Sequence, residues 1–166
     1  MTTLKSITMT LAIAATALTA MAPLAQAAGQ PNLKPAFSTK TGKVTVKNVG
    51  GGDAGRSLAT VHCQKVGGGG CADPTPAQIA PYENPAYPNK AVIKFGPVPG
   101  NSKKSHTFPF YAGLTWDSGN YIFTVCVDAG DHVAESNERD NCKRYRMRVK
   151  PNSVTPPRRL NLKSGS

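Results

Sequence analysis

Apolar and polar residues alternate along several short stretches of this chain, and the clearest alternation runs through residues 121–127, YIFTVCV. After an acidic and amide-rich turn, residues 142–149, CKRYRMRV, alternate again. Successive side chains of a β-strand point to opposite faces of the sheet, so the pattern predicts a β-hairpin with one buried and one exposed face. Shorter runs predict further strands at 44–47, 57–63, 91–95 and 105–110.

The segments between these runs carry strong turn signals, and no window shows sustained helical spacing. Glycine clusters occupy residues 50–52 and 67–70, and residues 97–100 read PVPG. Glycine and proline interrupt regular structure because of their backbone conformations. About seven short strands separated in this way predict an all-β fold, an antiparallel two-sheet sandwich.

Two segments depart from the strand pattern. Residues 72–91 contain five prolines together with Tyr82 and Tyr87. Proline cannot donate a backbone hydrogen bond to a sheet, so we expect a long surface insertion that its two tyrosines pack onto the sandwich. Residues 151–166 lack periodicity and are expected to form a flexible basic tail.

The N-terminal segment has the features of a secretory signal peptide. Lys5 precedes an uncharged run of apolar and small residues (7–24), and residues 25–27, AQA, fit a signal-peptidase site. The run contains a proline and is rich in alanine, so a membrane anchor is the weaker interpretation. We therefore expect residues 1–27 to be removed, a mature protein that begins at Ala28 without a membrane span, and a secreted or periplasmic location.

Four cysteines lie beyond that segment, at positions 63, 71, 126 and 142. An even number of cysteines in a small exported chain favours disulfides, because compartments outside the cytoplasm are oxidising. The spacings contain no CxxC pair, so a zinc site is the weaker alternative. We expect no resident metal and no cofactor.

Several motifs occur in the order found in a known bacterial and archaeal family. The chain has PNL at 31–33, VTVKNVGGGDAG at 44–55, FGPVPG at 95–100, a strand ending in Val127-Asp128, and VAESNERDN at 133–141. With these motifs the chain resembles the CARDB domain, an adhesion-related module, over about residues 31–150. The resemblance implies an immunoglobulin-like sandwich, here spanning residues 28–150 with 72–91 as an insertion.

The sandwich arrangement limits how the cysteines can pair. The strands that end near Cys63 and Cys126 are antiparallel neighbours in it, so these two strand ends lie at opposite edges of the sheet and a bridge between them is geometrically poor. Cys126 ends one arm of the final hairpin, and Cys142 begins the other. We predict the disulfide Cys126–Cys142 and, by remainder and local spacing, Cys63–Cys71.

The final predicted strand also carries a row of arginines. The parity that turns its apolar residues inward turns Arg144, Arg146 and Arg148 outward. One interpretation is that these charges blunt an exposed edge strand and keep the protein soluble. The other is that their guanidinium groups bind phosphate, sulfate or carboxylate, with Arg158 and Arg159 of the tail adding affinity. Both interpretations are open from the sequence, and the first is the default.

The formal net charge of +11 bears on the expected partners. Removal of Lys5 with residues 1–27 lowers it from +11 to +10. An exported protein of this charge attracts anionic polymers such as lipopolysaccharide, acidic polysaccharide or extracellular DNA through a salt-sensitive field. Specific nucleic-acid recognition is not expected, because few aromatic residues are interleaved with the basic ones. The expected partner is an anionic envelope polymer or a protein.

The acidic turn 128–141 has two interpretations. Its aspartate, glutamate and asparagine side chains offer the oxygen ligands that calcium prefers, although their spacing lacks the EF-hand pattern. The same residue types are favoured in turns, where their side chains accept hydrogen bonds from nearby backbone N–H groups. Calcium binding and a self-capped structural turn are both open, and the residue types favour the second.

No motif for catalysis stands out. The three histidines lack metal-ligand spacing, no GxSxG sequence is present, and paired cysteines leave no free thiol. The sequence therefore predicts a non-catalytic, exported binding or adhesion module that docks anionic polymers or proteins at the cell envelope. The alternative is a secreted inhibitor or accessory subunit that presents residues 72–91 to a partner protein.

Overall fold

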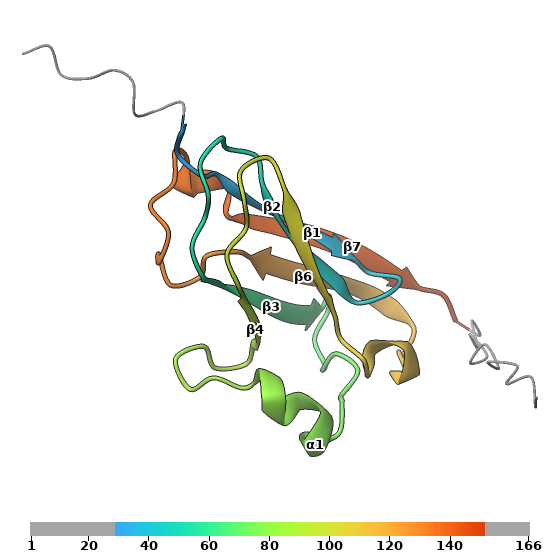
Figure 1. The fold of residues 1–166 in the computed structure, drawn as a ribbon. Coiled ribbons are helices and arrows are strands. Elements are labelled where there is room, and N and C mark those ends of the chain that lie inside the picture. The colour runs from blue at the N-terminus through green and yellow to red at the C-terminus, as the bar shows by residue number, and fades with distance from the viewer. Residues whose placement is uncertain (1–28, 152–166) are drawn as a thin grey trace, which may run out of the picture.

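Seven β-strands form the framework of the computed structural model, which describes residues 29–151 (Figure 1). The expected signal peptide, residues 1–27, and the tail residues Arg158 and Arg159 lie outside the described residues. Within the described range, no helix is long and apolar enough to cross a membrane. The strands are β1 (Leu33–Ser38), β2 (Lys43–Asn48), β3 (Ser57–Lys65), β4 (Ala91–Phe95), β5 (Lys103–Thr107), β6 (Gly119–Cys126) and β7 (Cys142–Val149).

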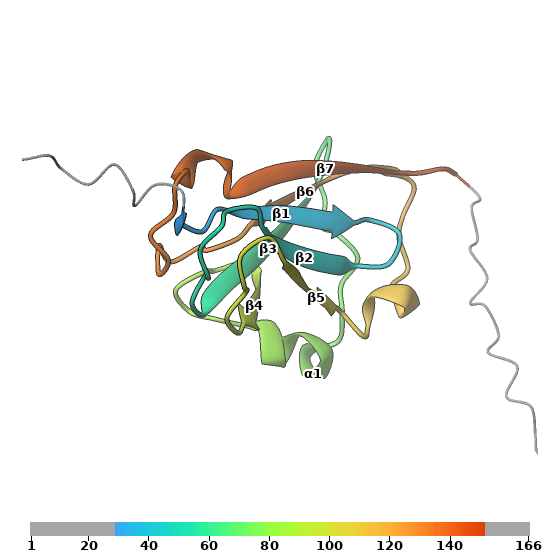
Figure 2. The same ribbon diagram turned by 45° about the horizontal axis from the view of Figure 1, so that its top comes forward.

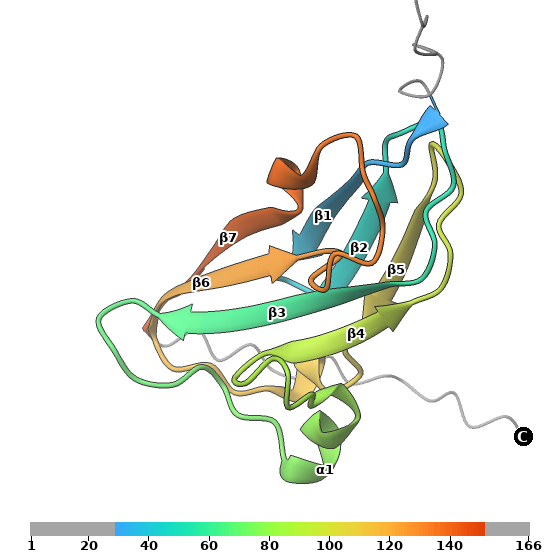
Figure 3. The ribbon, with the colours of Figure 1, turned by 90° about the vertical axis from the view of Figure 1, so that its left-hand side faces the viewer.

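The strands form two antiparallel sheets that face each other. One sheet has the order β1-β2-β5, and the other has the order β4-β3-β6-β7. Figures 2 and 3 show the two layers, with β7 beside β1 at one side of the sandwich. The predicted all-β, immunoglobulin-like sandwich of about seven strands is confirmed.

Alternation along the strands builds the core between the two sheets. Val44 and Val46 of β2 are fully buried, and Tyr121 of β6 in the other sheet is buried as well. The rings of Phe37 in β1 and Phe123 in β6 lie 5.0 Å apart between their centroids, so side chains of both sheets pack together. The predicted inward face of the final hairpin is therefore part of the core.

The last strand has the parity that the sequence predicts. Tyr145, Met147 and Val149 are half-buried against the core, while the residues between them are exposed. They are less buried than the apolar residues of β6 because β7 is an edge strand with a neighbour on one side only. The inward face of β7 closes the sandwich, and its outward face meets solvent.

A buried asparagine ties together the loops at one end of the sandwich. Oδ1 of Asn48 accepts hydrogen bonds from the backbone N–H groups of Asn32 and Gly50, each 3.1 Å away. Its Nδ2 group donates to the carbonyls of Gly52 (2.7 Å) and Val98 (3.0 Å). All four hydrogen-bonding positions of the amide are used, as burial of an amide requires.

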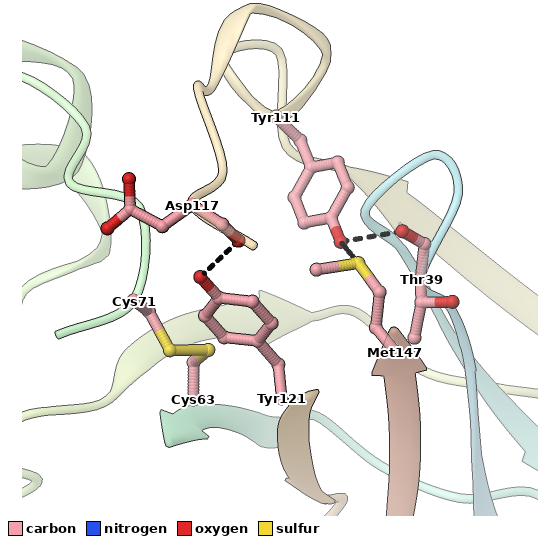
Figure 4. The surroundings of a disulfide bond; sticks show 7 residues. All are labelled: Thr39, Cys63, Cys71, Tyr111, Asp117, Tyr121 and Met147. Atoms are coloured by element: carbon pink, nitrogen blue, oxygen red, sulfur yellow. Dashed lines mark hydrogen bonds between the residues drawn. A yellow bond between two sulfur atoms is a disulfide. The ribbon is translucent and has the colours of Figure 1, made fainter. Parts of the chain in front are cut away.

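All four cysteines are disulfide-bonded. Cys126 and Cys142 are register partners across the β6–β7 hairpin, and their Cα atoms lie 4.0 Å apart. Cys63 near the end of β3 bonds to Cys71, with a Cα–Cα distance of 6.1 Å, beside the ring of Tyr121 (Figure 4). These are the two pairs that the sequence predicts.

The tyrosines of the proline-rich insertion fix it to β5 and to the turn that follows β6. The hydroxyl of Tyr82 lies 3.0 Å from Nε2 of His106 in β5, and its ring packs edge-on against Phe108. The hydroxyl of Tyr87 donates a hydrogen bond to the carbonyl of Ala129, 3.0 Å away. The expected packing role of the two tyrosines is confirmed. The insertion contains two short helices, α1 (Pro76–Ile79) and the 3-10 helix η2 (Ala80–Tyr82), which lie below β4 in Figure 3.

One strand lies earlier in the chain than the sequence predicts. The alternating pattern at 105–110 predicts a strand there, but β5 covers Lys103–Thr107. The chain leaves the sheet at Phe108, whose ring is buried, and the next residue, Pro109, has no N–H to donate. A 3-10 helix, η3 (Tyr111–Gly113), follows. The apolar residues of this run therefore reach the core from a turn.

Candidate anion-binding surface

The outward face of β7 carries three arginines at alternating positions, all of them exposed. Alternate residues of a strand lie about 6.6 Å apart, so the three side chains leave the sheet from evenly spaced points. Each arginine lies beside an outward residue of β6. The register partners are Arg144 and Thr124, Arg146 and Ile122, and Arg148 and Asn120.

The guanidinium groups of these arginines have no hydrogen-bond or ion-pair partner within residues 29–151. Lysines elsewhere differ, because Lys34 pairs with Asp140 at 2.9 Å and Lys65 pairs with Asp117 at 3.5 Å. A guanidinium group stays protonated and presents a planar fork of donors that matches carboxylate, sulfate and phosphate. The arginine row, Arg144, Arg146 and Arg148, is available to an anion.

The sheet that carries the arginine row has no carboxylate in its strands. None of β3, β4, β6 and β7 contains an aspartate or a glutamate. Lys94 of β4 adds a further exposed positive charge. Because like charges reinforce one another over a surface, the outer face of this sheet attracts anions from a distance.

A groove of about 510 Å³ lies beside the arginine row. Ile122 and Val66 give it an apolar part, and Asn120, Arg146 and Arg148 give it a polar and cationic part. The side chain of Val66 is conspicuous because the residue is 54% exposed. None of the residues that line the groove is acidic. The surface therefore combines guanidinium groups with aliphatic contact area.

The acidic turn between β6 and β7 is held together by its own backbone. Asp128 is buried, and its two carboxylate oxygens accept hydrogen bonds from the N–H groups of His132 (3.2 Å) and Val133 (2.9 Å). Asn137 caps the 3-10 helix η4 (Glu138–Asp140) in a similar way. The self-capped turn that the residue types favour is present.

Three carboxylates of this turn approach one another. Asp128, Asp131 and Glu138 each place one oxygen so that the three oxygens lie within 4.8 Å of one another. Asp131 and Glu138 are exposed, and both oxygens of Asp128 already accept backbone hydrogen bonds. Turn formation alone therefore accounts for the buried member of the cluster.

Glu135 connects the same turn to the first strand. Its Oε2 atom accepts a hydrogen bond from the backbone N–H of Leu33 at the start of β1. Burial raises the pKa of Glu135 to about 7, and the charges of Glu138 and Asp128 act in the same direction, while the Leu33 hydrogen bond opposes them. The carboxyl group is therefore neutral over part of the physiological pH range.

A larger cleft of about 860 Å³ lies between the insertion and the sandwich. Its lining includes Phe37 and Trp116 from the sandwich and Ile79 and Tyr87 from the insertion. The Cys63–Cys71 disulfide forms part of the wall. This cleft is the feature on which a role of residues 72–91 in partner binding would depend.

The sequence predicts the arginine row but not the groove beside it. Val66 stands directly before a glycine cluster, so its local context indicates a loop. The N–H of Val66 donates a hydrogen bond to the carbonyl of Asn120, 2.8 Å away, and this bond extends the pairing of β3 with β6. The alternation along β6 predicts that Asn120 and Ile122 point outward. It does not predict that Val66 lies beside them.

Comparison with known families addresses the same part of the chain. Residues 87–145 match the family model of the CARDB domain. The expected resemblance to the CARDB family is confirmed over this segment. The matched segment runs from the end of the insertion through β6 and the acidic turn into β7, so Arg144 lies within it and Arg146 and Arg148 follow it directly.

Two solved structures are similar to this chain over most of their own length. A CARDB domain from Pyrococcus furiosus in complex with di-metal ions shares 18% sequence identity, with a TM-score of 0.45, and the match covers 73% of this chain and 94% of that chain. A domain of a proposed cell surface protein from Methanosarcina acetivorans shares 15% identity, with a TM-score of 0.48, covering 72% and 92%. A search among curated proteins finds no match.

Proposed function

We propose that this chain is an exported, non-catalytic binding module that docks an anionic polymer on the outer face of β7. The observation that carries the proposal is the arginine row, which is exposed and without a partner inside the described chain. A surface that serves solubility alone usually mixes charges of both signs. The four strands around this row contain basic residues and no acidic ones.

The proposed mechanism is multivalent ion pairing. Each guanidinium group can donate two parallel hydrogen bonds to a carboxylate, sulfate or phosphate group. A polymer presents such groups repeatedly, so binding at one arginine raises the effective concentration of the next anion near its neighbour. Long-range attraction by the positive sheet face speeds the encounter and weakens as salt rises.

The cellular location follows from two lines of support. The two disulfides are typical of a protein that works in an oxidising compartment. The expected signal peptide at residues 1–27 would deliver the chain there. Together with the adhesion-related family, these features favour a secreted or periplasmic module that attaches to envelope material.

Retention on immobilised heparin at increasing salt tests the proposal. Replacing Arg144, Arg146 and Arg148 by serine should lower the salt concentration needed for elution. Replacing Lys43, Lys47 and Lys103 by serine is the matched control, because it removes the same charge from exposed residues of the other sheet. If both triple variants elute at the same salt concentration, net charge alone binds the polymer and the arginine row is not the docking site.

A second function is favoured by the cleft under the insertion. Because Tyr82 and Tyr87 hold the insertion in one position, residues 72–91 present a defined surface to a partner protein. The apolar lining of the 860 Å³ cleft offers contact area next to it. In this second proposal the chain is an inhibitor or accessory subunit that uses its proline-rich segment.

A pull-down from envelope and culture fractions separates the two functions. The bait proteins are the native chain, the arginine triple variant and a variant with Ile79→Ser and Glu83→Gln in the insertion. A protein that is retained by the arginine variant and lost from the insertion variant supports the second function. Loss from the arginine variant alone supports polymer docking, directly or through a polymer-bound protein.

A further inference from the structure

The groove beside the arginine row joins two kinds of surface within one site. Arg146 lies directly across from Ile122 in the register, and Val66 lines the same groove. A ligand that fills it therefore needs an anionic group close to an apolar surface of its own. A small anion without apolar surface would contact the cationic part of the groove and leave the apolar part uncovered.

Nucleic acid fits this groove poorly. Proteins bind single strands by stacking the bases on aromatic side chains as well as by neutralising phosphates. The aromatic residue of the groove, Tyr121, is 1% exposed and faces the core, so its ring is closed to a base. Val66 and Ile122 are aliphatic and offer no such platform. Inorganic polyphosphate has the charges but no apolar surface to cover these two side chains.

A carboxylated sugar satisfies both halves of the site. The C–H groups on one face of a pyranose ring can pack on aliphatic side chains, while a carboxylate on the ring accepts paired hydrogen bonds from a guanidinium group. The exposed amide of Asn120 both donates and accepts, which suits ring hydroxyl groups. We infer that the groove formed by Val66, Asn120, Ile122, Arg146 and Arg148 binds a uronic acid unit of an acidic polysaccharide. The inference rests on the proposed function and names its ligand class.

Calorimetric titration of the full oxidised protein with two polyanions tests the inference. The probes are oligogalacturonate and inorganic polyphosphate, compared at equal charge concentration and equal ionic strength. We expect Val66→Ser with Ile122→Ser to weaken oligogalacturonate binding about tenfold and to change polyphosphate binding by less than about twofold, because the substitutions remove apolar contact without changing charge.

Two further variants provide a matched control and a second test of the groove. Val49→Ser is the matched control for Val66→Ser, since Val49 is an exposed valine (47%) that does not line the groove. It should bind both probes like the native protein. Asn120→Ala, at an exposed position, should weaken oligogalacturonate binding without a loss of stability.

The possible outcomes distinguish failure of the sugar site from failure of the proposed polyanion docking. Suppose that replacing Arg146 and Arg148 by serine weakens the binding of both probes, while the groove variants weaken the binding of neither. The docking of polyanions then stands and the sugar site is wrong. If the arginine variant leaves both probes unaffected, the docking function itself fails. Equal loss of both probes in the groove variants, with Val49→Ser unchanged, also overturns the sugar site, because polyphosphate has no ring to pack on the groove.

Discussion

Tyr145 of β7 donates a hydrogen bond to the carbonyl of Pro35 in β1, 2.8 Å away, and so links an edge strand of one sheet to an edge strand of the other. The two residues are 110 positions apart in the chain. Because Tyr145 precedes Arg146, the same bond fixes the strand that presents the arginine row. Together with the packing of the Tyr145 ring against Phe37, this contact holds the row in place relative to the second sheet.

Tyr145→Phe should lower the free energy of unfolding by about 1 kcal/mol, because it removes one partly buried hydrogen bond and little apolar area. Urea unfolding with an unchanged m-value would measure this loss. Hydrogen exchange should become faster in β7. Tyr87→Phe removes a similar bond to Ala129 and should speed exchange near residues 129–131 instead. The same exchange pattern in both variants would argue against a local role for Tyr145.

Removing the hairpin disulfide by replacing Cys126 and Cys142 with alanine should cost about 3 kcal/mol of stability in the chain-entropy model. The corresponding change at Cys63 and Cys71 opens a loop half as long, 8 against 16 residues of separation, so it should cost about 0.6 kcal/mol less. Urea unfolding of both variants without reductant measures the difference. Non-reducing peptide mapping that returned a link between Cys63 and Cys126 would contradict the pairing.

Asn48→Asp tests the buried amide at the end of β2. The two shapes are nearly the same, but a carboxylate cannot donate to the carbonyls of Gly52 and Val98. We expect a loss of about 3 kcal/mol or more, since two buried acceptors lose their donor and a charge is buried among them. Asn101→Asp makes the same change at an exposed position and should be nearly silent in thermal unfolding. A silent Asn48→Asp variant would show that the loop network is dispensable.

Stability should fall as pH rises from about 4.5 to about 7 through the contribution of Glu135. Its pKa is raised from 4.5 to about 7, mainly by burial, so the native state holds a proton that the unfolded chain releases in this window. The contribution is fully present below 4.5 and is lost as pH rises through 7. Thermal unfolding of the native chain and of Glu135→Gln across this range measures it as a difference between the two proteins.

The glutamine variant keeps an acceptor for the N–H of Leu33 but cannot ionise. It should therefore gain stability relative to the native chain as pH rises from about 4.5 to about 7, and the difference should stay level above that. Glu83→Gln, at an exposed carboxylate of the insertion, is the control and should follow the native curve. A native-minus-variant difference that stays constant between pH 4.5 and 7 would contradict the assignment to Glu135.

The outward arginines and the disulfide pairs were within reach of the sequence because each depends on a local rule. Because one face of the hairpin is buried, apolar and polar residues alternate along residues 121–127 and 142–149. The position of Cys126 and Cys142 at facing strand ends follows from the same hairpin. Parity and chain connectivity are enough to predict both features.

Other features depend on contacts between segments that are distant in the chain. Such contacts produce no periodic pattern in the sequence. The four hydrogen bonds of Asn48 join residues from three separate parts of the chain. The groove needs Val66 to extend a ladder beyond the predicted end of its strand. The early end of β5 follows from the burial of Phe108 in a turn, where tertiary packing overrides the apolar pattern of the segment.

The anchored insertion has a consequence for how other molecules can approach this domain. Through η2 it contacts β4, and through Tyr82 it contacts β5, so it shields the outer strands on one side of the sandwich from pairing with a foreign strand. On the other side, β1 contains Pro35, which lacks an N–H, and the remaining edge strand, β7, carries the charges of the arginine row. Several copies of the domain can therefore bind one long polymer side by side. Each copy should bind through the outer face of its own sheet, and no copy should pair its strands with those of the next.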